Sequence, residues 1–158
     1  MEKIILSIVV VLGTLIAFKF KGIFHKIISI GLAVSILLIF WTSNKLVITG
    51  GFIVVIFLSI TTFIYGLKVK GLNRFERTSI AAMGLFCAYL MIAKTMHWPF
   101  ATLTALSMIV PVIITLATFI KDKRLIKEMS FMLFWLSYAV SVVLKVIITI
   151  VSDKILLV

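Results

Sequence analysis

Acidic residues are scarce in this chain, and none lies in the middle of a long apolar segment. The 158 residues include only five, and all are at segment ends or in loops: Glu2, Glu76, Asp122, Glu128 and Asp153. Ion- and proton-coupled transport usually depends on a carboxylate within the membrane. The sequence therefore argues against a proton-driven pump or motor that acts through this chain alone.

Metal ligands and catalytic motifs are equally sparse. The single cysteine, Cys87, excludes an intrachain disulfide and a multi-cysteine metal site, and we interpret it as a small buried side chain. The two histidines, His25 and His97, are predicted at opposite ends of the molecule, so one chain cannot form a two-histidine site. No serine–histidine–acid set, HExxH sequence or glycine-rich phosphate loop is present. We predict no catalytic residue, no metal and no cofactor.

Apolar residues, by contrast, dominate the chain. They make up 63% of it, and the mean hydropathy is +1.32, whereas about half is usual in soluble domains. The apolar runs are continuous rather than alternating, which favours helices over a barrel. We predict an all-α, polytopic integral membrane protein, folded as a single transmembrane helical bundle over residues 1–158.

Six segments approach the roughly 17 to 25 apolar residues that a membrane-spanning helix needs. They are Ile4–Phe20, Phe24–Thr42, Leu46–Leu67, Thr78–Met96, Ala101–Ile120 and Met129–Val151. The first is the shortest, and its flanking lysines could reach the interface. The fifth contains Pro111, which is predicted to kink it because proline lacks a backbone donor.

Basic residues are concentrated in three of the connecting loops. Eleven of the sixteen fall there, at Lys19, Lys21, Lys26, Lys68, Lys70, Arg74, Arg77, Lys121, Lys123, Arg124 and Lys127. Cytoplasmic loops carry such an excess, so both termini are predicted outside, in the periplasm of a bacterium with an inner membrane. This topological interpretation replaces nucleic-acid binding as the meaning of the net charge of +11. Membrane lipids are the expected partners.

The basic loops also suggest an internal repeat. Lys19, Lys70 and Lys121 recur at intervals of 51 residues, as do Lys94 and Lys145. This spacing predicts three helical hairpins, which could be a threefold repeat. The alternative is that bilayer-length hairpins with short loops produce the same spacing without common ancestry.

The stretch from Lys94 to Phe100 has the most varied chemistry in the chain. It places Lys94, His97, Trp98 and Pro99 between two apolar segments. One interpretation is an interfacial cap, with His97 and Trp98 at headgroup level and Pro99 ending the helix. The other is that His97 titrates near neutral pH or binds a ligand.

Lys94 and Lys145 are predicted inside the outer ends of two segments. Together they could attract an anion or a lipid headgroup near the outer leaflet. Alternatively, each side chain extends to the interface along its own flexible stem.

The sequence Lys94-Thr95-Met96-His97-Trp98-Pro99 resembles a K-x-x-H-W-P signature of Bacteroidota membrane proteins. It is most similar to the turn between the two transmembrane helices of the L subunit of the gliding-motility and type IX secretion motor. The resemblance implies a basic–aromatic turn on the periplasmic side between two antiparallel helices. In the motor subunit the following helix carries a glutamate tied to proton-driven torque. The stretch from Ala105 to Val112 has no acid, so the resemblance implies lineage and hairpin geometry but not motor function.

Three functions are consistent with these features. The first is a non-enzymatic subunit or scaffold of a bacterial inner-membrane complex, whose helices bind a protein partner or further copies of the chain. The second is a small channel or carrier for an anionic or neutral solute, with Lys94, His97 and Lys145 near its outer mouth. The third is a membrane-embedded enzyme that uses His97 or Cys87.

Overall fold

A computed structural model describes residues 2–19, 22–98, 101–121 and 128–155, and these contain seven helices and no strand. The helices are α1 (Glu2–Lys19), α2 (Ile23–Trp41), α3 (Lys45–Lys68), α4 (Arg74–Thr95), α5 (Ala101–Ser107), α6 (Ile109–Lys121) and α7 (Met129–Ile155). Five stretches are long and apolar enough to cross a membrane, and α1 is a shorter apolar helix. The prediction of an all-α, multi-pass membrane protein with about six spans is confirmed.

The fifth predicted span is divided into α5 and α6, with Met108 between them. Pro111 explains the position of the break. A proline has no N–H to donate to the carbonyl four residues earlier, and its ring clashes with that carbonyl. The residue four positions before Pro111 is Ser107, where α5 ends.

Helix α4 begins at Arg74, four residues before the predicted start at Thr78. A capping box explains the difference, because it satisfies backbone donors at the helix start. The Asn73 side chain accepts from the Glu76 N–H, and the Glu76 carboxylate accepts from the Asn73 N–H at 2.6 Å.

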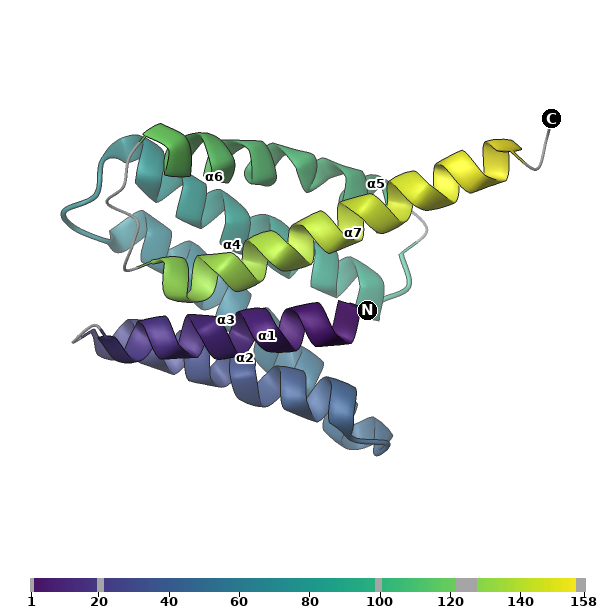
Figure 1. Cartoon of the computed structure of the whole chain (residues 1–158), viewed down its shortest axis with the longest axis horizontal. Coiled ribbons are helices and arrows are strands. Elements are labelled where there is room, and N and C mark those ends of the chain that lie inside the picture. Colours follow the sequence, from purple (N-terminus) through teal and green to yellow (C-terminus); the bar gives the residue numbers. More distant parts are fainter. Residues whose placement is uncertain (1, 20–21, 99–100, 122–127, 156–158) are drawn as a thin grey trace.

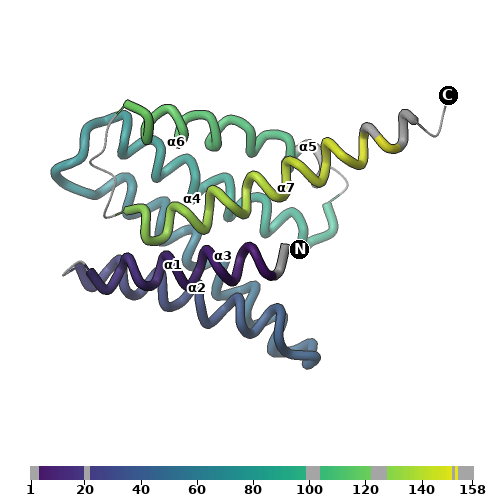
Figure 2. Tube along the Cα trace, in the orientation of Figure 1, coloured from purple at the N-terminus to yellow at the C-terminus, as the bar shows by residue number. Residues whose placement is uncertain are grey.

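The chain is arranged as a layered bundle crossed by α7 (Figure 1). Helices α1 and α2 lie side by side, α3 packs between α2 and α4, and α5 and α6 lie against α4. Helix α7 packs mainly on α1, and its C-terminal part projects beyond the other helices (Figure 2). The three predicted hairpins therefore pack differently from one another, and the 51-residue repeat stays a prediction.

Helices α3 and α4 approach each other most closely at two glycines. A Cβ at Gly84 would lie 2.5 Å from the backbone nitrogen of Phe63, and one at Gly66 would lie 2.5 Å from that of Ala81. Small residues let helix backbones pack in this way within a membrane. This contact fixes the position of α4, which carries Lys94 in its last turn and ends at Thr95.

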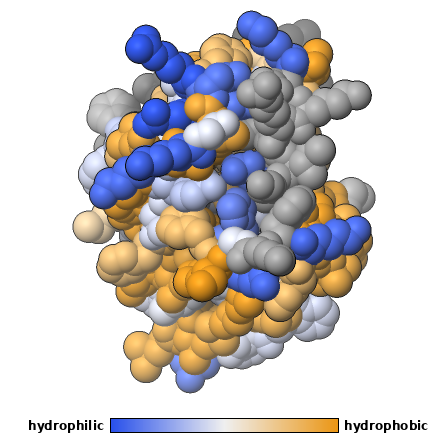
Figure 3. Space-filling model, turned by 90° about the vertical axis from the view of Figure 1, so that its left-hand side faces the viewer, coloured by the Kyte–Doolittle hydropathy of each residue, from blue (hydrophilic) through white to orange (hydrophobic). Residues whose placement is uncertain are grey.

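Polar side chains gather at one end of the bundle, here called the basic end (Figure 3). It carries the following described cations: Lys19, Lys26, Lys68, Lys70, Arg74, Arg77 and Lys121. At the other end, here called the pocket end, lie the turn between α2 and α3 and the end of α4. The two ends therefore differ in charge as the loop sequences predict.

Candidate functional site

A cavity of about 480 Å³ opens at the pocket end, between the α2–α3 hairpin and helices α4 and α7. This volume is within the roughly 300 to 1,000 Å³ of typical ligand pockets. Nine apolar and five polar side chains line it: Leu6, Ile36, Ile39, Phe40, Ile48, Phe52, Val55, Met91 and Phe134, and Thr49, Lys94, Thr95, His97 and Tyr138.

The polarity of the lining changes with depth. Thr49, Thr95 and His97 are exposed at the ends of their helices. The deeper lining residues Val55 and Phe134 are buried and apolar, and Val55 lies ten residues into the 24 residues of α3. The cavity therefore has a polar mouth and an apolar floor that reaches the middle of α3.

Lys94 brings a cationic group to the wall of this cavity. Its ammonium nitrogen lies 5.5 Å from the centroid of the Tyr138 ring, a distance at which a cation is attracted to an aromatic face. The Tyr138 hydroxyl in turn donates to the Met91 sulfur at 3.4 Å. Tyr138 is only 7% exposed, so a rigid ring positions the lysine.

His97 occupies the left-handed position that ends α4, with φ at 51°. The Trp98 N–H donates to the Ala93 carbonyl at 3.0 Å, and the His97 N–H donates to the Lys94 carbonyl at 3.3 Å. This pair of bonds is the Schellman arrangement that commonly ends helices. The turn reverses the chain at the cavity mouth and places the imidazole in its lining.

Trp98 packs away from the cavity lining and against Tyr89, with the ring centroids 5.8 Å apart. It is 43% exposed, which suits an indole at the membrane–water interface. Pro99 lies outside the described residues. The structure therefore supports the cap interpretation for Trp98, whereas His97 both ends the helix and lines a cavity.

Lys145 is not among the described residues that line the cavity. It follows Tyr138 by seven residues, so it lies on the same face of α7 about two turns, or 10 Å, further along. Its side chain is exposed. Of the predicted cationic pair, Lys94 is in the wall of the cavity and Lys145 lies beyond its mouth.

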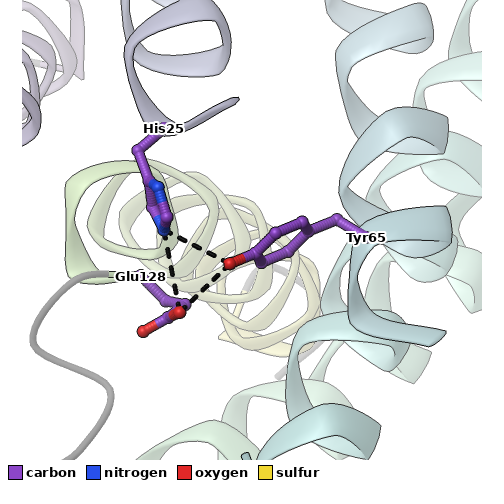
Figure 4. Close-up of polar contacts among 3 residues, drawn as sticks. All are labelled: His25, Tyr65 and Glu128. Carbon is purple, nitrogen blue, oxygen red and sulfur yellow. Dashed lines mark hydrogen bonds and ion pairs between the residues drawn. The ribbon is translucent and has the colours of Figure 1, made fainter. Parts of the chain in front are cut away.

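The basic end contains a second polar site, formed by His25, Tyr65 and Glu128 (Figure 4). The Tyr65 hydroxyl lies 3.2 Å from Glu128 Oε1 and 3.3 Å from His25 Nε2, and those two atoms are 3.7 Å apart. His25 is 8% exposed and Glu128 is 4% exposed. His25 lies in α2, Tyr65 lies in α3 and Glu128 immediately precedes α7, so the site joins the ends of three helices.

The hydrogen bonds of this site place one proton on His25 Nε2 when Glu128 is ionised. An ionised carboxylate can only accept, so Tyr65 donates its hydroxyl proton to Glu128, and Nε2 of His25 then donates to the Tyr65 oxygen. His25 Nδ1 and Glu128 Oε2 are buried, and neither has a hydrogen-bond partner among the described residues.

The sequence did not predict this site. Glu76 and Glu128 lie at helix ends as predicted, but their burial was not anticipated, and Asp122 lies outside the described residues. For Glu76 a signal was available, because Asn73-x-x-Glu76 matches a capping box. For Glu128 no local pattern announces the contact, since its partners lie 63 and 103 positions earlier in the chain.

The structure places the two histidines at opposite ends, as predicted: His25 in the first turn of α2 at the basic end and His97 after α4 at the pocket end. Cys87 is fully buried in α4, as predicted. Among the described residues, no group of three or more histidine, cysteine, aspartate and glutamate side chains is arranged to hold a metal ion.

A scan against protein-family profiles and searches of curated proteins and of solved structures give no match for this chain. The resemblance of the turn that begins at Lys94 to a motor subunit accordingly stays a prediction. We therefore argue function from the two polar sites themselves.

The left-handed backbone at His97 predicts opposite effects for two substitutions. His97→Gly should keep or raise the free energy of unfolding, by up to about 1 kcal/mol, because glycine adopts this conformation without a steric penalty. His97→Val should lower it by about 1 to 2 kcal/mol, because a β-branched residue is strained there. Denaturant unfolding in mild detergent measures both. A valine variant as stable as the glycine variant would contradict this account of the turn.

Proposed function

We propose that this membrane protein binds a single-chain amphiphile with an anionic head group in the cavity at the pocket end. The observation that carries the proposal is the polarity gradient of the lining, from Lys94 and His97 at the mouth to Val55 and Phe134 at the floor. Ligand sites typically combine an apolar wall with a few polar groups that orient the ligand. This function belongs to the carrier class among the three that the sequence allows.

The mouth supports an anionic head group. Lys94 supplies a cation on a ring-supported side chain, and His97 supplies a ring nitrogen that can donate a hydrogen bond. Lys145 adds a second cation further along α7 on the side of Tyr138. Charge-assisted hydrogen bonds are shorter and stronger than neutral ones, so these groups favour carboxylate, sulfonate or phosphate oxygens.

The floor supports an apolar tail. A small hydrated anion would lose its water against nine apolar side chains without compensation, which is costly. A pure hydrocarbon would offer no charge-assisted contact to Lys94 at the mouth. An amphiphile satisfies both parts, because its tail replaces water against the floor while its head remains at the polar mouth.

The packing below the cavity supports binding rather than an open channel. Trp135 is fully buried and its indole N–H donates to the Thr62 hydroxyl at 3.2 Å. Phe131 and Phe134 are also buried in the same part of α7. These large side chains fill the core between the cavity floor and the basic end.

Substitution of Lys94 should separate head-group recognition from tail binding. We expect Lys94→Gln to weaken dodecanoate binding about tenfold, which corresponds to about 1.4 kcal/mol, because a charge-assisted contact is lost. Binding of dodecanol, which has the same chain length and no charge, should change less than about twofold. Equilibrium binding to the protein in nanodiscs, corrected for partition into empty nanodiscs, measures both.

The matched control is Lys45→Gln, which removes an exposed lysine of α3 at the same end that does not line the cavity. It should leave dodecanoate affinity unchanged. If Lys45→Gln and Lys94→Gln weaken binding equally, the effect is general surface charge and the cavity assignment is wrong.

We further propose that the protein lies in a bacterial inner membrane with the basic end in the cytoplasm, which places the cavity mouth at the periplasmic side. The support is the excess of cations at one end of the bundle and the motif from Lys94 to Pro99.

Cysteine labelling in intact cells tests this orientation. Lys45→Cys should react with a membrane-impermeant maleimide added outside, whereas Lys70→Cys should react only after lysis. Both positions are exposed, and the native Cys87 is fully buried. Labelling of Lys70→Cys in intact cells would reverse the orientation.

A second candidate function is that of a subunit or scaffold, favoured by the projecting part of α7 (Figure 1). Leu144, Ile147 and Ile148 are exposed on this part, at 52%, 42% and 63%. Lipid tails would cover such a surface, and so would another helix.

Oxidative cross-linking distinguishes lipid tails from a second helix as the partner of this apolar surface. If α7 of one copy packs on α7 of another, Ile148→Cys should form a disulfide-linked dimer in membranes, whereas Ile113→Cys, on an exposed face of α6, should not. Monomers in both variants would remove self-association through α7 as a function.

A further inference from the structure

We propose that His25, Tyr65 and Glu128 form a one-proton site at the basic end whose occupancy is linked to ligand binding in the cavity. The linkage rests on the function proposed above, whereas the one-proton site does not. The linkage means that proton binding raises ligand affinity and that ligand binding favours the proton-bound form by the same factor.

The burial of His25 and Glu128 and the contact between them favour one proton at this site in addition to the one on Nε2. With His25 neutral and Glu128 ionised, the site carries one negative charge that is almost fully buried, and such a charge is costly without a partner. One proton taken from water makes the site neutral. It resides either on His25 Nδ1, which gives an imidazolium–carboxylate pair, or on the Glu128 carboxyl group. A second proton would leave a buried positive charge.

The charged and titratable surroundings of the site are limited among the described residues. From α3 the hydroxyl of Tyr65 faces the imidazole, and Glu128 faces it from the start of α7. The described cations nearest in sequence are Lys19 on α1, Lys26 on α2 and Lys68 on α3. Lys19 and Lys68 are exposed, and the Lys26 ammonium lies over the Phe18 ring at 5.6 Å.

The buried Nδ1 of His25 lies next to the backbone at the basic end. His25 Nδ1 faces Gly22, the residue just before α2, where an added Cβ would lie 2.5 Å from this nitrogen. Gly22 is partly exposed. Because Gly22 has no side chain, this residue places only backbone atoms beside Nδ1.

Two groups of aromatic contacts, which follow one another along α7, lie between the site and the cavity. Phe131 follows Glu128 by one turn, and its ring centroid lies 5.9 Å from those of both His25 and Tyr65. One turn further, Phe134 stacks on Tyr138 with centroids 6.4 Å apart. Tyr138 in turn supports the Lys94 ammonium in the cavity wall.

The same three helices meet at both sites. At the basic end His25, Tyr65 and Glu128 join α2, α3 and α7. At the pocket end, Ile36 of α2, Val55 of α3 and Phe134 of α7 line the cavity. The Trp135–Thr62 hydrogen bond lies between the two sites along α7 and α3. It can serve as a pivot for the α2–α3 hairpin relative to α7.

Loss of the proton leaves a buried negative charge on Glu128, and entry of water stabilises this charge. To admit the water, α7 moves away from α2 and α3 at the basic end. Rotation about the central contact then brings the opposite ends together and narrows the cavity. The proton-bound state is therefore the one with the open cavity, and ligand affinity should fall as pH rises.

The test uses dodecanesulfonate, because its head group remains ionised throughout the range from about pH 5 to about pH 9, in which histidine titrates. Wild-type protein in nanodiscs should lose about tenfold in affinity as pH rises through the titration of the site. Glu128→Gln keeps the size of the side chain and removes its charge. This variant should bind with the low-pH wild-type affinity at every pH.

His97→Gly is the matched comparison, because His97 is the other histidine and lines the cavity. It should bind more weakly but keep the same relative loss of affinity with pH. If His97→Gly abolishes the pH dependence, or if Glu128→Gln keeps it, the linkage is overturned while the proposed ligand function stands. Absence of binding at every pH would overturn both the ligand function and the linkage.

A second measurement tests the one-proton site without any ligand. The midpoints of thermal unfolding of His25→Gln, Glu128→Gln and the double variant give the coupling between the two side chains. The coupling should be largest at intermediate pH, where the pair shares one proton, and should decline at both extremes. A coupling that does not vary with pH would overturn the one-proton site.

Discussion

The hydrogen-bonding demand of the hydrocarbon core is the constraint on which this structure depends. Inside a membrane every polar group needs a partner within the protein, and most hydroxyls in the spans meet this demand within their own helix. Ser35, Ser59 and Thr62 each donate to the carbonyl four residues earlier. Polar residues that are satisfied locally cannot form a path across the core. Charged side chains are therefore confined to the two ends, and each end must stabilise its own charges.

The two ends solve this problem differently. At the pocket end Lys94 remains exposed, and a Tyr138 ring supports its charge, so an anion can reach it. At the basic end Glu128 is buried, and its carboxylate contacts His25 and Tyr65. Under the proposal above, the charge of this group changes by gain or loss of a proton. Helix α7 contributes to both sites, because its first three turns carry the aromatic side chains between them. One long helix thus contributes to the cavity at the pocket end and to the buried polar site at the basic end.

Local rules predicted most of the fold, and they failed where distant residues meet. Apolar runs gave the number of spans, and the proline rule gave a break, which the structure places between Ser107 and Ile109. The residues Lys94 and His97 were recognised as candidates from their chemistry alone. Their cavity was not, because its walls come from five helices and from His97, and no spacing along the chain reports which helices will be neighbours. The burial of Glu128 was hidden for the same reason.

The distinction between depth and burial changes what the scarcity of acids means. A carboxylate in the middle of a span was taken as the requirement for proton coupling, and its absence counts against a proton path across the membrane. Glu128 lies immediately before α7, yet it is only 4% exposed, and its carboxylate contacts Tyr65 of α3 and His25 of α2. The energetic cost of a charge depends on its surroundings rather than on its position along a helix. A carboxylate at a helix end can therefore couple a proton to helix packing, even in a chain whose acids all lie at the ends of the predicted spans or in loops.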